Sequence, residues 1–181
     1  MRPRKPEYPV GNMSTYTPYK PHHHDAVQRL GEEIFDHTYI HEFRATLRDA
    51  DPKSIVVLHK RQVVGFALLR HTRMFRYLDT IELAYLVVHP DYQGKQIGST
   101  LLQKVKEMSP NVILEVSYDN TAAERLYRRH GFETWRHLYT KANGGYLLGW
   151  SKQRHEQTLR LRSHQSPPAD GKEAPSTTHR P

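Results

Sequence analysis

The chain has 181 residues, a net charge of +8 and no cysteine. This length suits a single domain, because about 150 residues can bury roughly two thirds of the surface that the unfolded chain exposes. The lack of cysteine excludes a disulfide framework, a thiolate zinc site and a cysteine nucleophile. No apolar run approaches the ~18 residues of a membrane span, and the first residues do not form a signal peptide. We therefore expect an intracellular protein of the cytoplasm, or of the nucleus, without membrane contact.

The two ends of the chain carry most of the positive charge. Residues 1–10 hold three basic and one acidic residue (+2), residues 151–181 hold six basic and three acidic (+3), and the remainder carries +3. Both ends are rich in proline and poor in large apolar side chains, so packing cannot offset the entropy of ordering them. We expect a disordered arm over 1–12, a domain over 13–150, and a disordered basic tail over 151–181, with room for a short helix at its start. Contacts of these ends with nucleic acid are expected to be weak at most.

Between the ends, helix and strand patterns alternate. In chain order they predict a strand over 13–19, helices over 25–34 and 38–49, strands over 54–59, 63–69 and 80–88, a helix over 97–108, a strand over 112–116, a helix over 121–130, and strands over 133–138 and 146–150. The run at 80–88 is almost continuously apolar, which indicates a strand that is buried on both faces. The order predicts an α/β fold with a mixed sheet and central crossovers.

Local signals indicate where these elements end. Asp25 is expected to cap the first helix. Lys60-Arg61-Gln62 and Asn143-Gly144-Gly145 are expected as hairpin turns. The expected buried stripes of the first and third helices are Val27, Leu30 and Ile34, and Ile97, Leu101, Val105 and Met108.

The first stretch that carries chemistry is 88–102, with the sequence VHPDYQGKQIGSTLL. It runs from the end of a buried strand through a glycine-containing loop into the start of a helix. The N–H groups of a helix N-terminus are unpaired and lie at the positive end of the helix dipole, so they bind phosphate readily. Lys95 adds a cation, and Gly94 and Gly98 allow a ligand to approach the backbone closely. An ordinary strand-to-helix turn would also explain these residues.

The second stretch is 119–132, with the sequence DNTAAERLYRRHGF. Asn120 follows the strand and can cap the next helix, and Gly131 can end that helix. Tyr127 lies on the apolar side of the same helix. Capping and core packing alone would account for Asn120 and Tyr127.

Taken together, the two stretches resemble the two signature motifs of the GNAT superfamily of acetyl-CoA-dependent N-acetyltransferases, at the spacing of that family. The family's loop has the pattern Gln/Arg-x-x-Gly-x-Gly/Ala, and here the loop reads Gln93-Gly94-Lys95-Gln96-Ile97-Gly98. The resemblance covers 13–150 and is most specific over 81–132. It implies a mixed, mostly antiparallel sheet with flanking helices, in which the fourth and fifth strands splay apart.

The resemblance also implies acetyl-CoA as cosubstrate and no metal. The pantetheine arm would lie between the splayed strands and bond to the backbone of Leu86, Val87 and Val88. Asn120 would reach the pantetheine, and Tyr127 would lie near the thioester sulfur. The pyrophosphate would bind the N–H groups of the loop made by Gln93, Gly94, Lys95, Gln96, Ile97, Gly98 and Ser99.

One position departs from the family pattern. Gln96 stands where the family has the first glycine of this pattern, so a Cβ is present where the backbone normally presses against phosphate. If this position needs a positive φ, the side chain costs about 1 kcal/mol or more. Gly94, two residues earlier, is the candidate to relieve that cost.

Acetyl transfer needs a neutral amine, a stabiliser of the oxyanion and an acid for the leaving thiolate. Backbone N–H groups near Leu86–Val88 can polarise the thioester carbonyl. Tyr127, as a phenol with a pKa near ~10, is protonated at neutral pH and is the expected general acid.

Glu82 is the expected base. Its strand is similar to the fourth strand of the histone lysine acetyltransferase branch, where a glutamate at this place acts as base. Burial would raise the pKa of a lone carboxyl in an apolar strand toward working pH, which suits a base. An ion pair of Glu82 with Arg70 or Arg73 across a hairpin is the alternative.

The acceptor amine is expected between the first two helices, the connection between the third and fourth strands, and the last hairpin. Acidic residues of the two helices (Glu32, Glu33, Asp36 and Glu42) suit a protonated lysine or polyamine, whereas the basic run 71–76 suits the acidic flanks of a protein. We expect a protein amine, either a lysine or an N-terminus. A small-molecule amine is the enzymatic alternative, and a non-catalytic CoA-binding module is the third.

Two further expectations concern metals and assembly. The run His22-His23-His24 has no carboxylate cluster near it, and His37 and His41, four residues apart as in metal pairs, lack a third ligand, so we expect no metal site. The chain is expected to be a monomer or a homodimer.

Overall fold

The computed structural model describes residues 14–71, 79–139 and 144–163. In this part of the chain the strands are β1 (Ser14–Pro18), β2 (Ile55–His59), β3 (Gln62–His71), β4 (Thr80–Val88), β5 (Asn111–Ser117), β6 (Glu133–Leu138) and β7 (Gly145–Ser151). The helices are α1 (His24–Ile34), α2 (His37–Arg48), α3 (Ile97–Met108), α4 (Thr121–Arg129) and α5 (Lys152–Ser163), with short 3-10 turns η1 (Pro21–His23) and η2 (Pro90–Tyr92). The predicted order of helices and strands is confirmed.

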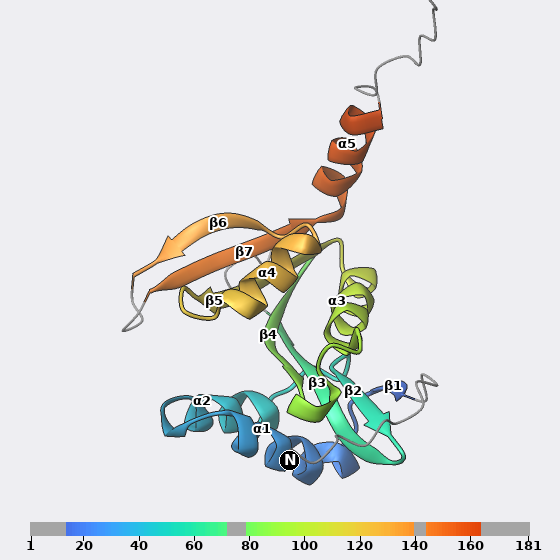
Figure 1. Cartoon of the computed structure of the whole chain (residues 1–181), viewed down its shortest axis with the longest axis vertical. Helices are drawn as coiled ribbons and strands as arrows, with labels where there is room; N and C mark the ends of the chain where they lie inside the picture. The colour runs from blue at the N-terminus through green and yellow to red at the C-terminus, as the bar shows by residue number, and fades with distance from the viewer. Residues whose placement is uncertain (1–13, 72–78, 140–143, 164–181) are drawn as a thin grey trace, which may run out of the picture.

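The seven strands form one sheet in the order β1-β2-β3-β4-β5-β7-β6 (Figure 1). Only β4 and β5 are parallel, and every other neighbouring pair is antiparallel. The parallel pair arises because α3 carries the chain back between β4 and β5, as a parallel connection requires. The predicted mixed, mostly antiparallel sheet is confirmed.

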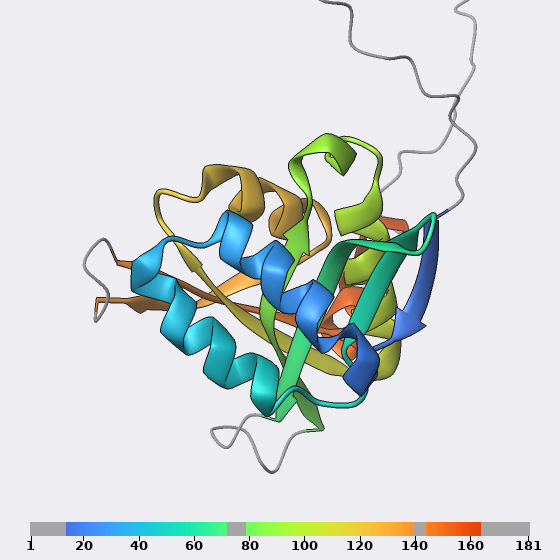
Figure 2. The ribbon, with the colours of Figure 1, turned by 90° about the horizontal axis from the view of Figure 1, so that it is seen from below.

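Helices cover both faces of the sheet. On one face, α1 and α2 pack on β2–β4 through a cluster that includes Val27, Phe43 and Phe66, and Figure 2 shows these two helices in front of the sheet. On the other face, α3 and α4 pack through a larger cluster that includes Leu101 and Tyr127. β4 contributes to both clusters, so the prediction that it is buried on both faces is confirmed in outline.

Three end-of-helix predictions are wrong for local reasons. Asp25 does not cap α1, because the 3-10 turn η1 precedes the helix and places His23 at the cap and Asp25 in the first turn. Ile34 and Met108 do not belong to the core, since each is 38% exposed at the last position of its helix. An apolar residue at a helix end can satisfy the helical period and still lie beyond the sheet that the helix covers.

The first predicted hairpin turn is confirmed. His59 pairs with Gln62, and the two residues between them, Lys60 and Arg61, have φ values of 49° and 68°. Positive φ at both positions is the geometry of the type I′ turn, which matches the twist of the flanking strands. The second predicted turn, Asn143-Gly144-Gly145, lies partly outside the described residues, which resume at Gly144. The basic run 71–76 also lies outside them except for its first residue.

The expected tail begins with helix α5, which extends away from the sheet in Figure 1. Its first turns touch the domain, since Arg154 lies 3.5 Å from Glu133 and the ring centres of His155 and Trp150 are 6.2 Å apart. A helix at the start of the tail is thus present. The expected disorder farther along lies outside the described residues, as does the expected arm over 1–12.

Candidate functional site

The sheet splits between β4 and β5. The two strands pair only at their first residues, Thr80 with Asn111, Ile81 with Val112 and Glu82 with Ile113. Beyond this point they diverge, as Figure 1 shows, so the edge of β4 from Leu83 to Val88 has no partner strand on the β5 side. An open strand edge presents backbone donors and acceptors that an extended ligand can pair with. The splayed strands implied by the resemblance are confirmed.

A bulge in β4 lies at the mouth of this split. Leu68 pairs with Tyr85 and Leu69 pairs with Leu83, which leaves Ala84 as the extra residue. A bulge interrupts the ladder and re-aims nearby backbone groups. Here it turns Tyr85 and Val87 toward α1 and α2, while Leu86 and Val88 remain on the side of α3 and α4.

The loop from Gln93 to Ser99 leads from η2 into α3. Thr100 donates the first intrahelical hydrogen bond, to the carbonyl of Gln96 at 2.9 Å, so the N–H groups of Ile97, Gly98 and Ser99 precede the helical ladder. Gly94 has a φ of +75° and a Cβ there would meet nothing within 4 Å, which leaves the loop backbone accessible. Such a helix start suits an anionic group.

Two side chains of this loop are already engaged. Lys95 donates to the carbonyl of Asp91 at 3.0 Å, and its ammonium lies 4.7 Å from the centre of the Tyr92 ring. Gln93 Nε2 donates to the carbonyl of Val88 at 3.2 Å, which is the last carbonyl of the β4 edge. The loop is therefore anchored to β4 and carries one cation beside the helix start.

Gln96 has a φ of 62° and a ψ of 8°, so the departure from the family pattern falls on a left-handed residue. Gly94 does not relieve this cost, because it has a positive φ of its own. We expect Gln96→Gly to raise the free energy of unfolding by about 1 kcal/mol, measured by chemical denaturation. Affinity for CoA is expected to stay equal or to tighten. A clear loss of affinity would mean that the Gln96 side chain itself contacts the phosphates, and this account would be wrong.

Asn120 caps α4 and Tyr127 lies on it, beside the split between β4 and β5. Asn120 Oδ1 accepts a hydrogen bond from the N–H of Ala123 at 3.2 Å, so the predicted helix cap is confirmed and the side-chain amide nitrogen is left for a ligand. Tyr127 is 7% exposed and its ring packs 5.9 Å from that of Phe132. Burial raises the pKa of Tyr127, so the phenol keeps its proton at neutral pH.

The structure brings most of the predicted site residues together. Leu86 and Val88 pack against the same cluster that contains Ile97 and Tyr127. A Cβ added to Gly98 would lie 3.4 Å from Leu126 and 3.8 Å from Val88, so the helix start approaches both α4 and the end of β4. The β4 edge, the loop and α4 therefore lie together on the face of the sheet that α3 and α4 cover.

Glu82 lies apart from this group. It pairs with Arg70 in the β3–β4 register, and Arg70 Nη2 lies 2.6 Å from Glu82 Oε1. The hydrogen bond with Glu82 raises the pKa of Arg70. The side chain of Glu82 is only 15% exposed and that of Arg70 is 40% exposed, so the carboxylate is shielded while the guanidinium reaches solvent. This pairing is the alternative that the sequence left open.

A second carboxylate was missed by the sequence analysis. Glu115 is exposed on β5, between Leu114 and Val116, which are both in the core on the α4 side. Glu115 lies on β5 two residues beyond Ile113, the last residue of β5 that pairs with β4, so it belongs to the part of β5 that borders the split. The signal was available, since a charged residue inside an apolar strand marks the position that faces outward.

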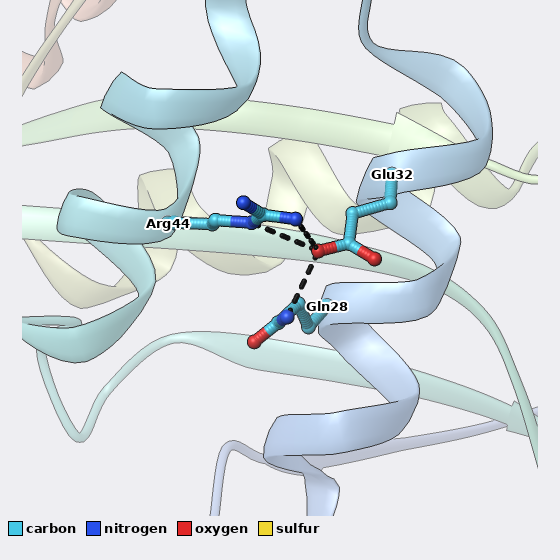
Figure 3. Close-up of polar contacts among 3 residues, drawn as sticks. All are labelled: Gln28, Glu32 and Arg44. Atoms are coloured by element: carbon cyan, nitrogen blue, oxygen red, sulfur yellow. Dashed lines mark hydrogen bonds and ion pairs between the residues drawn. The ribbon is translucent and has the colours of Figure 1, made fainter. Parts of the chain in front are cut away.

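Two of the four acidic residues expected to attract a polycation are engaged within the structure. Figure 3 shows Glu32 Oε1 accepting from Gln28 Nε2 at 2.8 Å and from Arg44 Nε and Nη2 at 2.9 and 2.6 Å, and these bonds lower the pKa of Glu32. Asp36 caps α2 by accepting from the N–H of Thr38. Glu32 thus joins α1 to α2 and Asp36 caps α2, while Glu33 and Glu42 stay exposed.

The wall beside the bulge on this face is aromatic. The ring centres of Phe35 and Phe43 lie 5.1 and 5.4 Å from that of Tyr85. Burial, reinforced by the negative charge of Glu42, raises the pKa of Tyr85 to about 12. Tyr85 is therefore a neutral, positioned side chain between β4 and the α1–α2 junction.

Two features are absent from the part of the chain that the structure describes. Within 14–71, 79–139 and 144–163, no group of three or more His, Cys, Asp or Glu side chains is arranged to hold a metal ion. In the same residues, no helix is long and apolar enough to cross a membrane.

Comparison with known proteins identifies the family. The model described as the Acetyltransferase (GNAT) family matches residues 16–132, and the chain belongs to this family. The chain is 39% identical over 71 residues to the N-alpha-acetyltransferase RimI of Mycobacterium tuberculosis, and 36% identical over 90 residues to an uncharacterized protein of Mycobacterium leprae. These matches take in 38% and 46% of this chain but only 42% and 24% of the two relatives, so the chain matches less than half of each.

Solved structures share the fold at low sequence identity. NAA60 of Arabidopsis thaliana in complex with acetyl-CoA is 19% identical with a TM-score of 0.65, covering 76% of this chain and 99% of that one. The ribosomal-protein-S18-alanine N-acetyltransferase of Escherichia coli is 20% identical with a TM-score of 0.61, covering 77% and 94%.

Proposed function

We propose that this protein transfers the acetyl group of acetyl-CoA to a primary amine. The observation that carries the proposal is the split between β4 and β5, with the start of α3 at one end and Tyr127 beside it. The open β4 edge can pair with the amides of the pantetheine arm, and the N–H groups at the start of α3 can bind the pyrophosphate. Membership of the GNAT family supports the same ligand.

In this mechanism the general acid lies on one face of the sheet and the general base on the other. The amine nitrogen attacks the thioester carbon while backbone N–H groups beside the β4 bulge stabilise the oxyanion. The C–S bond then breaks, and the thiolate takes the proton of Tyr127, which lies on the face of α3 and α4. The proton that the amine loses goes to a carboxylate on the opposite face.

We assign this base role to Glu115. Glu82, the residue expected from sequence, is only 15% exposed and lies against Arg70 at 2.6 Å, so an amine reaches it less easily. Glu115 is exposed on β5 beyond the last β4–β5 pair, and its place between Leu114 and Val116 directs it to the face away from Tyr127. Glu82 then has a positioning role, because it fixes Arg70 on the β3–β4 hairpin.

The acceptor that we propose is the N-terminal amine of a protein. Exposed apolar side chains flank the aromatic wall, with Ile34 and Tyr39 at 38% and 39% exposure at the α1–α2 junction. Tyr139 is 83% exposed after β6. A polypeptide can cover such a surface, and two of the four carboxylates that suited a polyamine, Glu32 and Asp36, are engaged by Arg44 and by the cap of α2. The relative named as the N-alpha-acetyltransferase RimI supports this acceptor class.

Acetyl-CoA is expected to stabilise the folded protein by about 2.7 kcal/mol at a hundredfold excess over its dissociation constant, because it binds only the folded state. The melting temperature should therefore rise through an acetyl-CoA titration, and acetate alone should have no effect. A folded protein whose melting temperature is unchanged up to millimolar acetyl-CoA would overturn the proposal.

A further inference from the structure

A second concave site lies at the far end of α3 from the phosphate-binding loop. The ends of α3, α4 and β7 and the starts of β6 and α5 enclose a cavity of about 460 Å³, where α5 leaves the sheet in Figure 1. Lys106 on its wall is ten residues along α3 from Gln96, which corresponds to about 15 Å of helix. This volume lies within the ~300–1,000 Å³ of small-molecule sites.

The lining of this basic cavity carries an excess of positive charge. One carboxylate, Glu133, contributes to it, against the ammonium of Lys106 and the guanidinium groups of Arg128, Arg129 and Arg154, and the imidazoles of His130 and His155 also line it. Arg128 pairs with Glu124 at 2.9 Å and Arg154 lies 3.5 Å from Glu133. Among the described residues no carboxylate pairs with Lys106 or Arg129. Positive charge in the cavity is thus only partly compensated.

The pKa values of two groups that line the cavity are lowered. Burial, followed by the charges of Lys106 and Arg129, lowers the pKa of His130. Burial also lowers the pKa of Lys106, whose ammonium donates to the carbonyl of His130 at 3.0 Å. Burial thus disfavours the charged form of both groups, and an anion bound beside them would offset that cost.

An aromatic ring is fixed on the same wall. A Cβ at Gly149 would come to 1.9 Å from Trp135, so the indole lies directly on the backbone of β7 and only glycine leaves room for it. Trp135 is half-buried and lines the cavity. A positioned indole beside arginines suits a flat aromatic ligand that carries negative charge.

We propose that the basic cavity binds a phosphate-bearing aromatic molecule of the size of one nucleotide, at a site separate from the acetyl-CoA cleft. The phosphate would pair with Arg129 and Lys106, and the base would contact Trp135. The proposal does not depend on the acetyltransferase assignment, because none of these side chains lines the split between β4 and β5.

The two tryptophans of the chain supply a local reporter. Trp135 lines the cavity and Trp150 lies beside it, against His155. ADP is titrated against tryptophan fluorescence with the cleft saturated by CoA, which keeps ADP from the α3 loop. Arg129→Glu is compared with Lys53→Glu, a matched charge reversal on an exposed loop. Parallel titrations use inorganic phosphate, a single-stranded oligonucleotide and polyglutamate.

We expect ADP to change the fluorescence saturably, with weaker binding of phosphate alone. Arg129→Glu should weaken ADP binding about ten- to a hundredfold, the range for losing a charge-assisted hydrogen bond, while Lys53→Glu leaves it unchanged. If Arg129→Glu unfolds the protein, Arg129→Gln is the milder variant, and it should weaken ADP binding at least about tenfold. Three results would overturn the proposal. ADP at millimolar concentration gives no fluorescence response, or both Arg129 variants bind ADP with wild-type affinity. The third is that the oligonucleotide or polyglutamate binds as tightly as ADP.

Discussion

Tyr127→Phe is expected to lower the turnover number about 10²–10⁴-fold, the usual contribution of a positioned general acid. The variant keeps the ring that packs against Phe132 in the α4 core and removes only the hydroxyl. Burial raises the pKa of the phenol, so the wild-type group carries its proton throughout the neutral range and can donate it to the thiolate. Steady-state kinetics with a saturating amine give the comparison.

Binding separates this role from a structural one. The dissociation constant for CoA and the melting temperature should change little in Tyr127→Phe, because packing and the phosphate loop are intact. Phe132→Leu serves as the control, since it loosens the same cluster without touching the hydroxyl. Full activity in Tyr127→Phe would leave the tyrosine a core residue only and assign the proton to another group.

Glu115→Gln is expected to lower turnover by about 10²-fold or more near neutral pH and to recover partly at high pH. Glutamine keeps the shape and the exposure of the side chain but cannot accept the proton of the amine. At high pH the amine is already neutral, so a base contributes less. The pH profile of kcat/KM is the measurement, taken with one peptide acceptor.

Glu82→Gln is the matched comparison on the neighbouring strand. Because it removes the charge that holds Arg70 at 2.6 Å, it should lower stability and give a smaller loss of activity that does not vary with pH. A pH-dependent loss in Glu82→Gln together with a flat profile in Glu115→Gln would reverse the assignment and restore the base expected from sequence.

Sequence patterns predicted the elements, the cap of α4 and the loop that leads into α3 because their signals are local. Asn120 caps α4 through an N–H three residues away, and the positive φ of Gln96 follows from its place before the start of α3. Neither feature depends on how distant segments pack.

The role of Glu82 could not be decided in the same way. Its pairing with Arg70 depends on the β3–β4 register, and that register contains a bulge at Ala84 that no sequence period announces. The sequence likewise suggested that Glu32 and Asp36 form part of an acidic surface, but Glu32 pairs with Arg44 and Asp36 caps α2. Contacts between segments far apart in sequence set these roles.

The basic cavity was beyond sequence reasoning for a related reason. Its lining comes from the ends of three helices and two strands, so no single stretch of the chain contains its pattern. Arg128, Arg129 and His130 are adjacent in sequence, but their partners on α3 and α5 are more than twenty residues away.

Release of free CoA from acetyl-CoA tests the central claim most directly. The full chain is incubated with acetyl-CoA and either peptides with free N-termini, the same peptides with blocked N-termini and a free lysine, or polyamines. We predict release that depends on the acceptor, is fastest with free N-termini, and is matched by one added acetyl group in the mass of the peptide. CoA release no faster than in acceptor-free controls for every amine, from a protein that acetyl-CoA stabilises, would contradict the account and leave a CoA-binding module.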